Sequence, residues 1–155
     1  MPLNRAFIGR EYSFDTPFEV GRELIRHFAL AIGDVNPIYH DVAAAKAAGH
    51  RDLVAPPTFL TTLGFRRGGG PVGDPDLGLD YSLVVHGEQK FVLHRPIYAG
   101  DALIGRTTVT DIRDVGRNEA MVMETAVLAA DGEQVATVVM TMISRGSAAP
   151  KEGAA

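Results

Sequence analysis

One short polar segment holds most of the side chains that could take part in acid–base chemistry. It runs Asp34-Val-Asn-Pro-Ile-Tyr-His40 and is followed by Asp41. An imidazole titrates near neutral pH, and a carboxylate beside it can orient the ring or share in a proton transfer. Because Asn36 and Pro37 favour a bent backbone, Asp34 and a residue five or six positions later can face the same point. The segment therefore predicts a general acid–base site at Asp34 and His40.

These residues also have a structural interpretation that needs no chemistry. An Asn-Pro sequence starts a turn, and Asp41 is well placed to cap a short Ala-rich helix over 42–48, closed by Gly49. Turns and helix caps use the same residue types as acid–base sites, so both interpretations stay open at this point.

The remaining titratable residues favour acid–base chemistry without a metal or a cofactor. The chain has no Cys, which excludes disulfide scaffolds, thiolate zinc sites, iron–sulfur clusters and Cys nucleophiles. Its 5 His have no short ligand spacing, so we expect no metal site and no cofactor. His86 and Glu88 lie two residues apart on one face of a predicted strand, where a second polar pair is conceivable. An isolated strand His is, however, more often packed or exposed.

Length, charge and hydropathy limit the classes to which the chain can belong. With 155 residues and a mass of 16.6 kDa it fits one domain, which we place at 1–145, followed by a flexible tail at 146–155. A net charge of −4 and a pI near 5.7 argue against nucleic acid as the main partner. No apolar run is long enough to span a membrane, and the N-terminal residues lack the apolar core of a signal peptide. We therefore expect a cytoplasmic protein without membrane contact.

The candidate site must be positioned by helices and strands that occupy different halves of the sequence. In the first half, apolar residues at helical spacing predict a helix over 20–32 that ends at Gly33. Pro56 and Pro57 precede a second predicted helix, over 59–65, that is apolar on most sides. Segments rich in Val, Ile, Thr and Met predict strands at 81–93, 102–112, 120–128 and 134–143, with an earlier edge strand at 10–14.

Segregated helices and strands indicate an α+β fold. A curved antiparallel meander wrapped around the central apolar helix is the simplest way to bury both, and dimerisation would cover the free edges of the sheet. The Gly- and Pro-rich stretch at 66–79, which separates the two halves, predicts a mobile loop.

Three motifs, in this order, resemble those of the MaoC-like hotdog enzymes, the (R)-specific enoyl-thioester hydratases and 3-hydroxyacyl-thioester dehydratases. Asp34-Val-Asn-Pro resembles the start of their active-site motif, Asp-x-Asn-Pro-[Leu/Ile]-His, and residues 53–59 look like the start of their central helix. Residues 91–103 resemble their second signature, Pro-[Ile/Val]-x-x-Gly-Asp-x-Leu. The resemblance covers about residues 5–145. It is closest to the stand-alone MaoC N-terminal-like dehydratase proteins, which include substrate-binding subunits of the mycolic-acid-type (3R)-hydroxyacyl dehydratase.

The resemblance implies a hotdog fold and a hydro-lyase activity, the reversible syn elimination of water from a 3-hydroxyacyl thioester of CoA or acyl carrier protein. In the family an Asp and a His handle the water and the α-proton, and backbone N–H groups at the start of the central helix polarise the thioester carbonyl. The implied assembly is a homodimer, or a heterodimer with a MaoC-like subunit. Asp34 matches the family Asp, and Asn36 and Pro37 match its Asn-Pro.

Two departures from the family pattern bear on the site. The family His lies five residues after the Asp, where this chain has Tyr39, whereas His40 lies six residues after it. A Tyr, with a pKa near 10, is a poor base at neutral pH. Catalytic members open the central helix with His-Gly, where this chain has Pro56-Pro57. Because Pro has no N–H, the N–H of Thr58 would be the nearest substitute donor.

We therefore predict a dehydratase or hydratase component of fatty-acid-type metabolism, with Asp34 and His40 as its catalytic residues. The candidate substrate-binding residues are Asn36, Tyr39, Thr58, Phe59 and His86. The alternative is a non-catalytic acyl-binding subunit that pairs with a catalytic MaoC-like partner. A hotdog acyl-binding or regulatory protein without a reaction also stays open. A hotdog thioesterase is less favoured, because residues 58–67 contain no carboxylate that could activate water.

Overall fold

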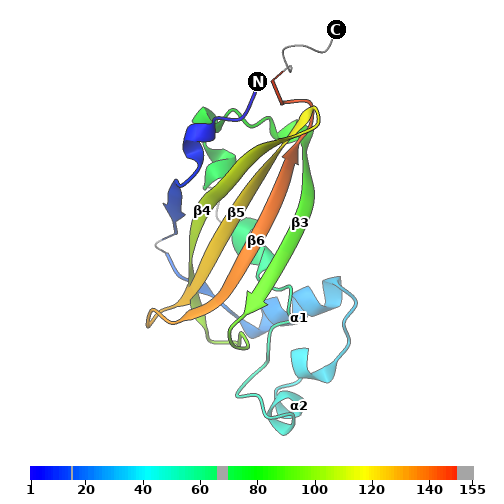
Figure 1. Ribbon diagram of the computed structural model, residues 1–155. Helices are drawn as coiled ribbons and strands as arrows, with labels where there is room; N and C mark the ends of the chain where they lie inside the picture. The colour runs from blue at the N-terminus through cyan, green and yellow to red at the C-terminus, as the bar shows by residue number, and fades with distance from the viewer. Residues whose placement is uncertain (15, 66–69, 150–155) are drawn as a thin grey trace.

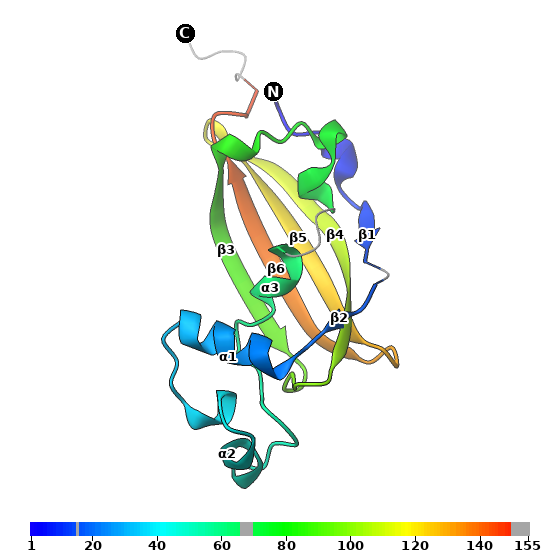
Figure 2. The same ribbon diagram turned by 180° about the vertical axis from the view of Figure 1, so that it is seen from behind.

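The computed structural model describes residues 1–14, 16–65 and 70–149. They form an α+β fold built on one six-stranded antiparallel sheet, in the order β1-β4-β5-β6-β3, with β2 also paired to β4 (Figures 1 and 2). The strands are β1 (Glu11–Ser13), β2 (Phe18–Glu19), β3 (Val84–Leu93), β4 (Ala102–Val115), β5 (Asn118–Ala129) and β6 (Gln134–Ser144). The α-helices are α1 (Arg22–Ala31), α2 (Val42–Ala47) and α3 (Thr61–Phe65).

The four long strands lie close to where the sequence predicts them, but the predicted strand at 81–93 begins only at Val84, after a 3₁₀ turn at Tyr81–Leu83. The prediction of a simple meander is wrong. β4, β5 and β6 are consecutive neighbours, joined by tight turns in which Gly116 and Gly132 have φ of 65° and 89°. β3 instead pairs with β6 and is not a neighbour of β4. The connection from β3 to β4 makes backbone hydrogen bonds with the segment before α3, such as Ala55 N to Ile97 O at 2.7 Å. These bonds hold the connection across the end of the sheet, so it does not close a hairpin.

Local sequence signals account for the boundaries of α1 and α2. α1 ends at Ala31, and Gly33 then adopts a φ of 73°, which glycine allows at little cost. The carboxylate of Asp41 accepts a hydrogen bond from Ala44 N at 2.7 Å and so caps α2. Both helices therefore follow the sequence prediction closely.

α3 is shorter and begins later than the sequence predicts. The residues ahead of α3 form turns with hydrogen bonds between residues three apart: Phe59 N donates to Pro56 O at 2.9 Å, and Thr61 N donates to Thr58 O at 3.1 Å. The helix that crosses the inner face of the sheet in Figure 2 therefore has only 5 residues.

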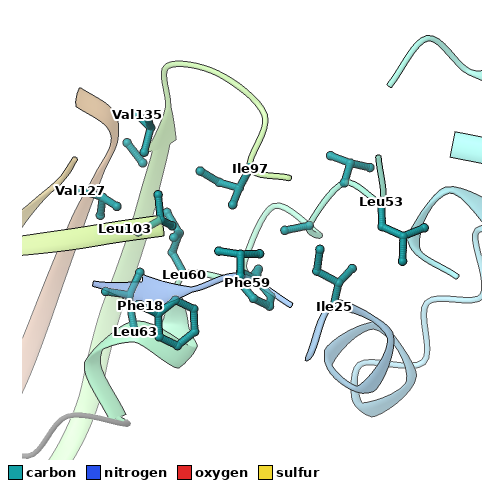
Figure 3. Close-up of a cluster of buried hydrophobic side chains, with 14 of the residues drawn as sticks. Phe18, Ile25, Leu53, Phe59, Leu60, Leu63, Ile97, Leu103, Val127 and Val135 are labelled. Carbon is teal, nitrogen blue, oxygen red and sulfur yellow. The ribbon is translucent and has the colours of Figure 1, made fainter. Parts of the chain in front are cut away.

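The apolar core lies where α1, α3 and the β3–β4 connection meet the sheet (Figure 3). Phe59, which is 1% exposed, packs edge-on against Phe28, with 5.5 Å between the ring centroids, and lies 6.3 Å from the ring of Phe18. A second cluster of buried residues packs Leu3 and Phe7, in the N-terminal segment, against other residues of the sheet. The inner face of the sheet is thus covered by separate parts of the chain.

The predicted mobile loop at 66–79 is partly structured. Residues 66–69 lie outside the described residues, but Pro71–Gly73 and Pro75–Leu77 form 3₁₀ turns, and Leu77 is fully buried. Asn4 N donates to Leu77 O at 2.9 Å, which ties these turns to the N-terminal segment.

Only residues 146–149 of the predicted tail are described. In this stretch Ser147 Oγ donates to Ser144 O at 3.2 Å, and Gly146 N donates to the side chain of Asn118 at 3.0 Å. The start of the tail is therefore attached to the end of the sheet.

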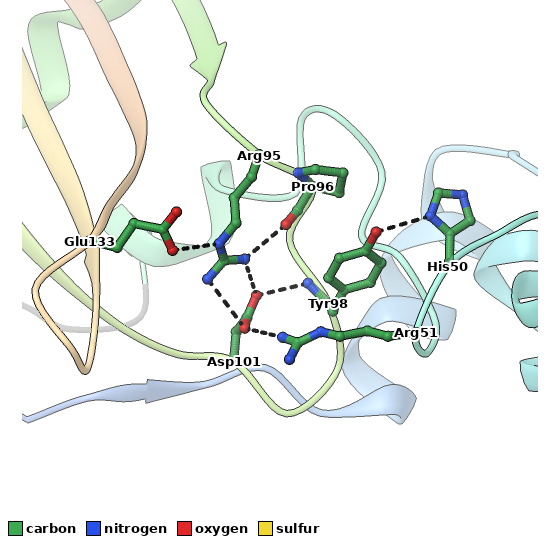
Figure 4. Close-up of polar contacts among 7 residues, drawn as sticks. All are labelled: His50, Arg51, Arg95, Pro96, Tyr98, Asp101 and Glu133. Carbon is green, nitrogen blue, oxygen red and sulfur yellow. Dashed lines mark hydrogen bonds and ion pairs between the residues drawn. The ribbon is translucent and has the colours of Figure 1, made fainter.

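One buried carboxylate joins the β3–β4 connection to the segment that precedes α3 (Figure 4). Asp101, 7% exposed, accepts hydrogen bonds from Arg95 Nη1 at 2.8 Å and from Tyr98 N at 2.9 Å. The guanidinium of Arg51 also donates to it. Arg95 in turn reaches Glu133 in the β5–β6 turn, with 3.0 Å between Nε and Oε2. The Asp of the second signature therefore has a structural role in this chain.

The charge of Asp101 stabilises the fold. Burial alone would raise the pKa of this carboxyl, but hydrogen bonds from Arg95 and Tyr98, together with the charges of Arg95 and Arg51, hold the pKa below its ordinary value of 3.8. A depressed pKa means that the folded chain releases this proton more readily than the unfolded chain. The stabilisation is therefore complete above the ordinary pKa and is lost as the pH falls through the lowered value.

Replacing Asp101 by Asn should lower the free energy of unfolding by roughly 2 kcal/mol at neutral pH, because the arginines lose their buried charged partner. Chemical denaturation near neutral pH and at about pH 3 measures the effect, and the difference from wild type should shrink at the acidic pH. Asp111→Asn, in a solvent-exposed ion pair with Arg113, is the matched control and should leave unfolding nearly unchanged. An equal loss at both pH values would contradict a role for the Asp101 charge.

Candidate functional site

The segment that carries the acid–base motif folds as a series of turns directly after α1. Asp34 N donates to Ala29 O at 2.8 Å, and Asp34 Oδ1 accepts from Asn36 N at 3.0 Å. Asn36 Oδ1 accepts from Ile38 N at 3.3 Å, at the start of the 3₁₀ turn Pro37–Tyr39. Both polar side chains thus help to set the backbone, as the structural interpretation of the sequence predicts. The second carboxylate oxygen of Asp34 makes no hydrogen bond with a described residue, so it stays available to a ligand.

His40 faces back toward Asp34, but it contacts the backbone and not the carboxylate. Its Nε2 lies 2.8 Å from the carbonyl oxygen of Asp34. A carbonyl oxygen can only accept a hydrogen bond, so Nε2 carries the proton and Nδ1 is the acceptor of the neutral ring. Arg26 Nε donates to His40 O at 2.9 Å, which holds the turn against α1. While this arrangement lasts, Nε2 cannot take a proton from a substrate.

Tyr39, at the position of the family His, lies in the core. It is 9% exposed and belongs to the same apolar cluster as Phe59. Burial, and to a smaller extent the negative charge of Asp34, raise the pKa of Tyr39 above its ordinary value of 10. The phenol is therefore protonated at neutral pH, and it can donate a hydrogen bond but cannot act as a base.

The two candidate binding residues ahead of α3 differ in burial and in hydrogen bonding. Thr58 is exposed, and its N–H makes no hydrogen bond with any described residue. Phe59 is buried, and its N–H donates to Pro56 O at 2.9 Å. Thr58 could therefore donate to a ligand through its backbone, whereas Phe59 belongs to the core.

His86 lies apart from the motif, on an exposed part of β3. It aligns in register with Met142, and a bulge at Gly87 shifts the register before Glu88. The bulge interrupts the regular alternation that would have placed His86 and Glu88 on one face. The predicted site residues that the structure does bring together are those of one turn: Asp34, Asn36, Tyr39 and His40.

A cavity of about 340 Å³ lies between α3 and the inner face of the sheet, and the sequence analysis did not predict it. Its lining is mainly apolar and comes from α3 with its approach, from the 3₁₀ turn Pro71–Gly73 and from the long strands. The apolar side chains include Phe14, Leu60, Leu63, Met123, Val138 and Met140. None of the motif residues Asp34, Asn36, Tyr39 or His40 contributes to this lining.

Small residues on the inner face of β4 create room for the cavity. A Cβ at Gly105 would lie 3.3 Å from Thr125 Cγ2 and 3.8 Å from both Leu63 and Phe14. Gly105 and Thr107 lie two residues apart on β4, so both face the helix across the cavity. A small residue facing a central helix is the sequence signal that could have indicated this space.

Two other kinds of site are absent from the described part of the chain. No group of three or more His, Cys, Asp or Glu side chains is arranged there to hold a metal ion. None of its helices combines the length and the hydropathy needed to cross a membrane.

The comparison with known protein families agrees with the three sequence motifs. A family model described as "FAS1-like, dehydratase domain region" matches residues 6–138. A UPF0336 protein of Parafrankia sp. (strain EAN1pec) is 58% identical over 151 residues, which are 97% of this chain and 100% of the relative. The predicted resemblance to MaoC-like proteins is thereby confirmed at the level of the family.

Solved structures extend the likeness to the fold. A MaoC-like dehydratase matches with a TM-score of 0.80 and 33% identity over 92% of this chain, which spans only 43% of that protein. The HadBC (3R-hydroxyacyl-ACP dehydratase) complex from Mycobacterium tuberculosis matches with a TM-score of 0.74 and 28% identity, covering 88% of this chain and 96% of the other. From its matched sequence, its sheet wrapped around α3 and these relatives, the chain belongs to the FAS1-like dehydratase-region family of MaoC-like hotdog proteins and to the UPF0336 family.

Proposed function

We propose that this chain is a component of a MaoC-like (3R)-hydroxyacyl-thioester dehydratase or enoyl-thioester hydratase, and that its main role is to bind the acyl group. The cavity of about 340 Å³ between α3 and the sheet carries this proposal. A mostly apolar cavity with a few polar groups is typical of sites for small ligands, and burying an acyl chain in it is favourable by roughly 25 cal/mol per Å². The substrate would be an acyl thioester of CoA or acyl carrier protein in the cytoplasm.

The geometry of the motif supports a division of labour between this chain and a partner. The family reaction needs a His that can exchange a proton beside the Asp. Here Tyr39 is a buried, protonated phenol, and His40 donates to the carbonyl of Asp34. A partner with an intact Asp-x-Asn-Pro-x-His motif would supply the missing base. In support, the HadBC relative is a dehydratase complex.

β3 is the strand through which such a partner could join the sheet. It ends the strand order and pairs only with β6 among the described strands. Three of its apolar side chains are exposed, Val85 at 42%, Val92 at 38% and Leu93 at 37%. Native proteins cover unpaired apolar edges, because they otherwise pair with other chains. A second chain paired to β3, either another copy or the catalytic partner, would continue the sheet.

Catalysis by this chain itself is a second candidate. The turn already holds the His40 ring 2.8 Å from the backbone of Asp34. If His40 released that carbonyl, its imidazole could exchange a proton with a substrate, and the unbonded carboxylate oxygen of Asp34 could orient the reacting water.

Hydration of a trans-2-enoyl-CoA separates the two candidates. We expect the purified chain alone to be inactive, because Tyr39 is a protonated phenol and His40 directs Nε2, which carries a proton, and not its acceptor nitrogen toward Asp34. Mixed with a MaoC-like protein that keeps the full motif, it should be active. In that mixture Asp34→Asn should reduce the rate by less than about threefold, whereas replacing the motif His of the partner should reduce it by roughly 10²–10⁴-fold.

Asp41→Asn is the matched control, because Asn keeps the N-terminal cap of α2. Suppose the chain alone is active, and its rate falls by about a hundredfold in Asp34→Asn and His40→Ala but not in Asp41→Asn. The chain would then be its own catalyst, and the division of labour would be wrong.

Filling the cavity should shorten the acyl chain that the protein accepts. Gly105→Val would project methyl groups toward Thr125 and Leu63, while a β-branched residue suits a strand. We expect decanoyl-CoA to bind at least about tenfold more weakly in a calorimetric titration, with butyryl-CoA unchanged. Thr108→Val, on the opposite face of β4, is the control. If both variants bind decanoyl-CoA as the wild type does, the cavity is not the acyl site.

A further inference from the structure

We propose that the cavity under α3 selects acyl chains that carry an oxygen, as a hydroxyl or keto group, partway along the chain. The inference rests on the proposed function, because it takes this cavity as the acyl site. It is carried by a polar band, the residues Gln89, Thr107 and Thr125, in a lining that is otherwise mainly apolar.

The threonines of the polar band lie on neighbouring strands. Thr107 on β4 and Thr125 on β5 face each other in register, with 2.8 Å between their hydroxyl oxygens. One hydroxyl donates to the other, and the hydrogen of the second has no acceptor among the described residues. Because Thr107 is only 8% exposed and both residues line the cavity, a ligand in the cavity could accept a hydrogen bond from this donor.

The third group of the polar band lies on β3, at nearly the same depth. The amide of Gln89 is half-buried and makes no hydrogen bond with any described residue. In the sheet register Thr125 aligns with Val138 of β6, and Gln89 aligns with Met140, two residues further along that strand. Two residues of a strand rise by about 6.6–6.8 Å. The threonine pair and Gln89 therefore reach the cavity within one such step of each other.

The lining is mainly apolar on both sides of the polar band, although Thr61 of α3 and the largely exposed Tyr81 also contribute to it. Leu63 and Gly105 line the side toward α1, and Met142 lines the side toward the N-terminal segment. An unsubstituted alkyl chain that filled the cavity would displace water from the band and leave its donors and acceptors without partners, which is unfavourable. An oxygen on the chain at this depth would accept from the free threonine hydroxyl or from the Gln89 amide.

This chemistry gives the cavity a basis for selection that size alone lacks. A pocket that hydrogen-bonds a polar group rejects the analogue without that group far more strongly than an apolar pocket rejects a missing methylene. The apolar parts set how long a chain is accepted, and the polar band sets which chain of that length binds best.

The test is a calorimetric titration of the full-length protein with decanoyl-CoA and with a series that carries one hydroxyl or keto group at successive carbons beyond C3, because a 3-hydroxyl belongs to the substrate of the proposed function itself. We expect one position, or two adjacent ones, to bind about tenfold more tightly than decanoyl-CoA, which corresponds to one additional buried hydrogen bond. In the double variant Thr107→Val, Thr125→Val this preference should disappear, with decanoyl-CoA bound as tightly as before or more tightly. Gln89→Leu should also reduce the preference for the oxygen-bearing chain over decanoyl-CoA.

Thr108→Val is the matched control, because it removes a hydroxyl from the same strand on the opposite face and should leave the preference intact. Free CoA is titrated as well. A weaker binding of free CoA to the double variant would mean that the polar band contacts the pantetheine arm, and the inference would be wrong. It would also be wrong if no position of the oxygen improved binding, or if the double variant kept the preference.

The outcomes distinguish this inference from the proposed function. If decanoyl-CoA binds, Gly105→Val weakens it and no oxygen position helps, then only the selection by the polar band fails. If no acyl-CoA binds, or if Gly105→Val changes nothing, then the cavity is not an acyl site and both proposals fail.

Discussion

The shortness of α3 is the constraint on which the rest of this structure depends. A sheet curved around a central helix must cover its inner face, but a helix of 5 residues reaches only part of it. Phe59 and its neighbours cover one end, and the cluster of Leu3, Phe7 and Leu77 covers the other. The cavity is the space that remains between these two clusters beside α3, so its position follows from how three separate segments share the inner face.

The same arrangement explains why a buried charge is needed at Asp101. Because β3 pairs with β6, the connection to β4 cannot be a hairpin, and an isolated antiparallel bridge between Tyr98 and Val54 pairs it with the segment before α3. The guanidinium groups of Arg95 and Arg51 reinforce this short pairing by meeting the Asp101 carboxylate, and Arg95 also reaches the β5–β6 turn. Asp101, which belongs to the sequence pattern that resembles the second family signature, is therefore needed for folding, because it joins the helical segments to the strand ends.

Local signals were sufficient to predict most elements, and long-range contacts account for what was missed. Segments rich in Val, Ile, Thr and Met indicate all four long strands, Gly33 marks the end of α1, and Asp41 marks the cap of α2. Composition shows that a segment forms a strand but not which strand lies beside it, so the predicted neighbours of β3 are wrong. For the candidate site, the sequence predicts the turn but not the contacts of its side chains. Whether His40 contacts the carboxylate or the carbonyl of Asp34 depends on how the turn packs against α1.

The burial of Tyr39 keeps the altered motif apart from the cavity. The buried ring of Tyr39 stabilises the core cluster that also contains Phe59, whereas a catalytic His must stay accessible to the substrate and able to change its charge. With Tyr at this position, the segment can be packed more firmly because none of its groups has to ionise in the core. In this chain the cavity that could hold an acyl group is lined by residues other than those of the motif. Acyl binding can therefore be kept while the acid–base pair is modified, provided that a second chain supplies the base. The exposed edge of β3 is the part of the structure through which that second chain could be held in a fixed position.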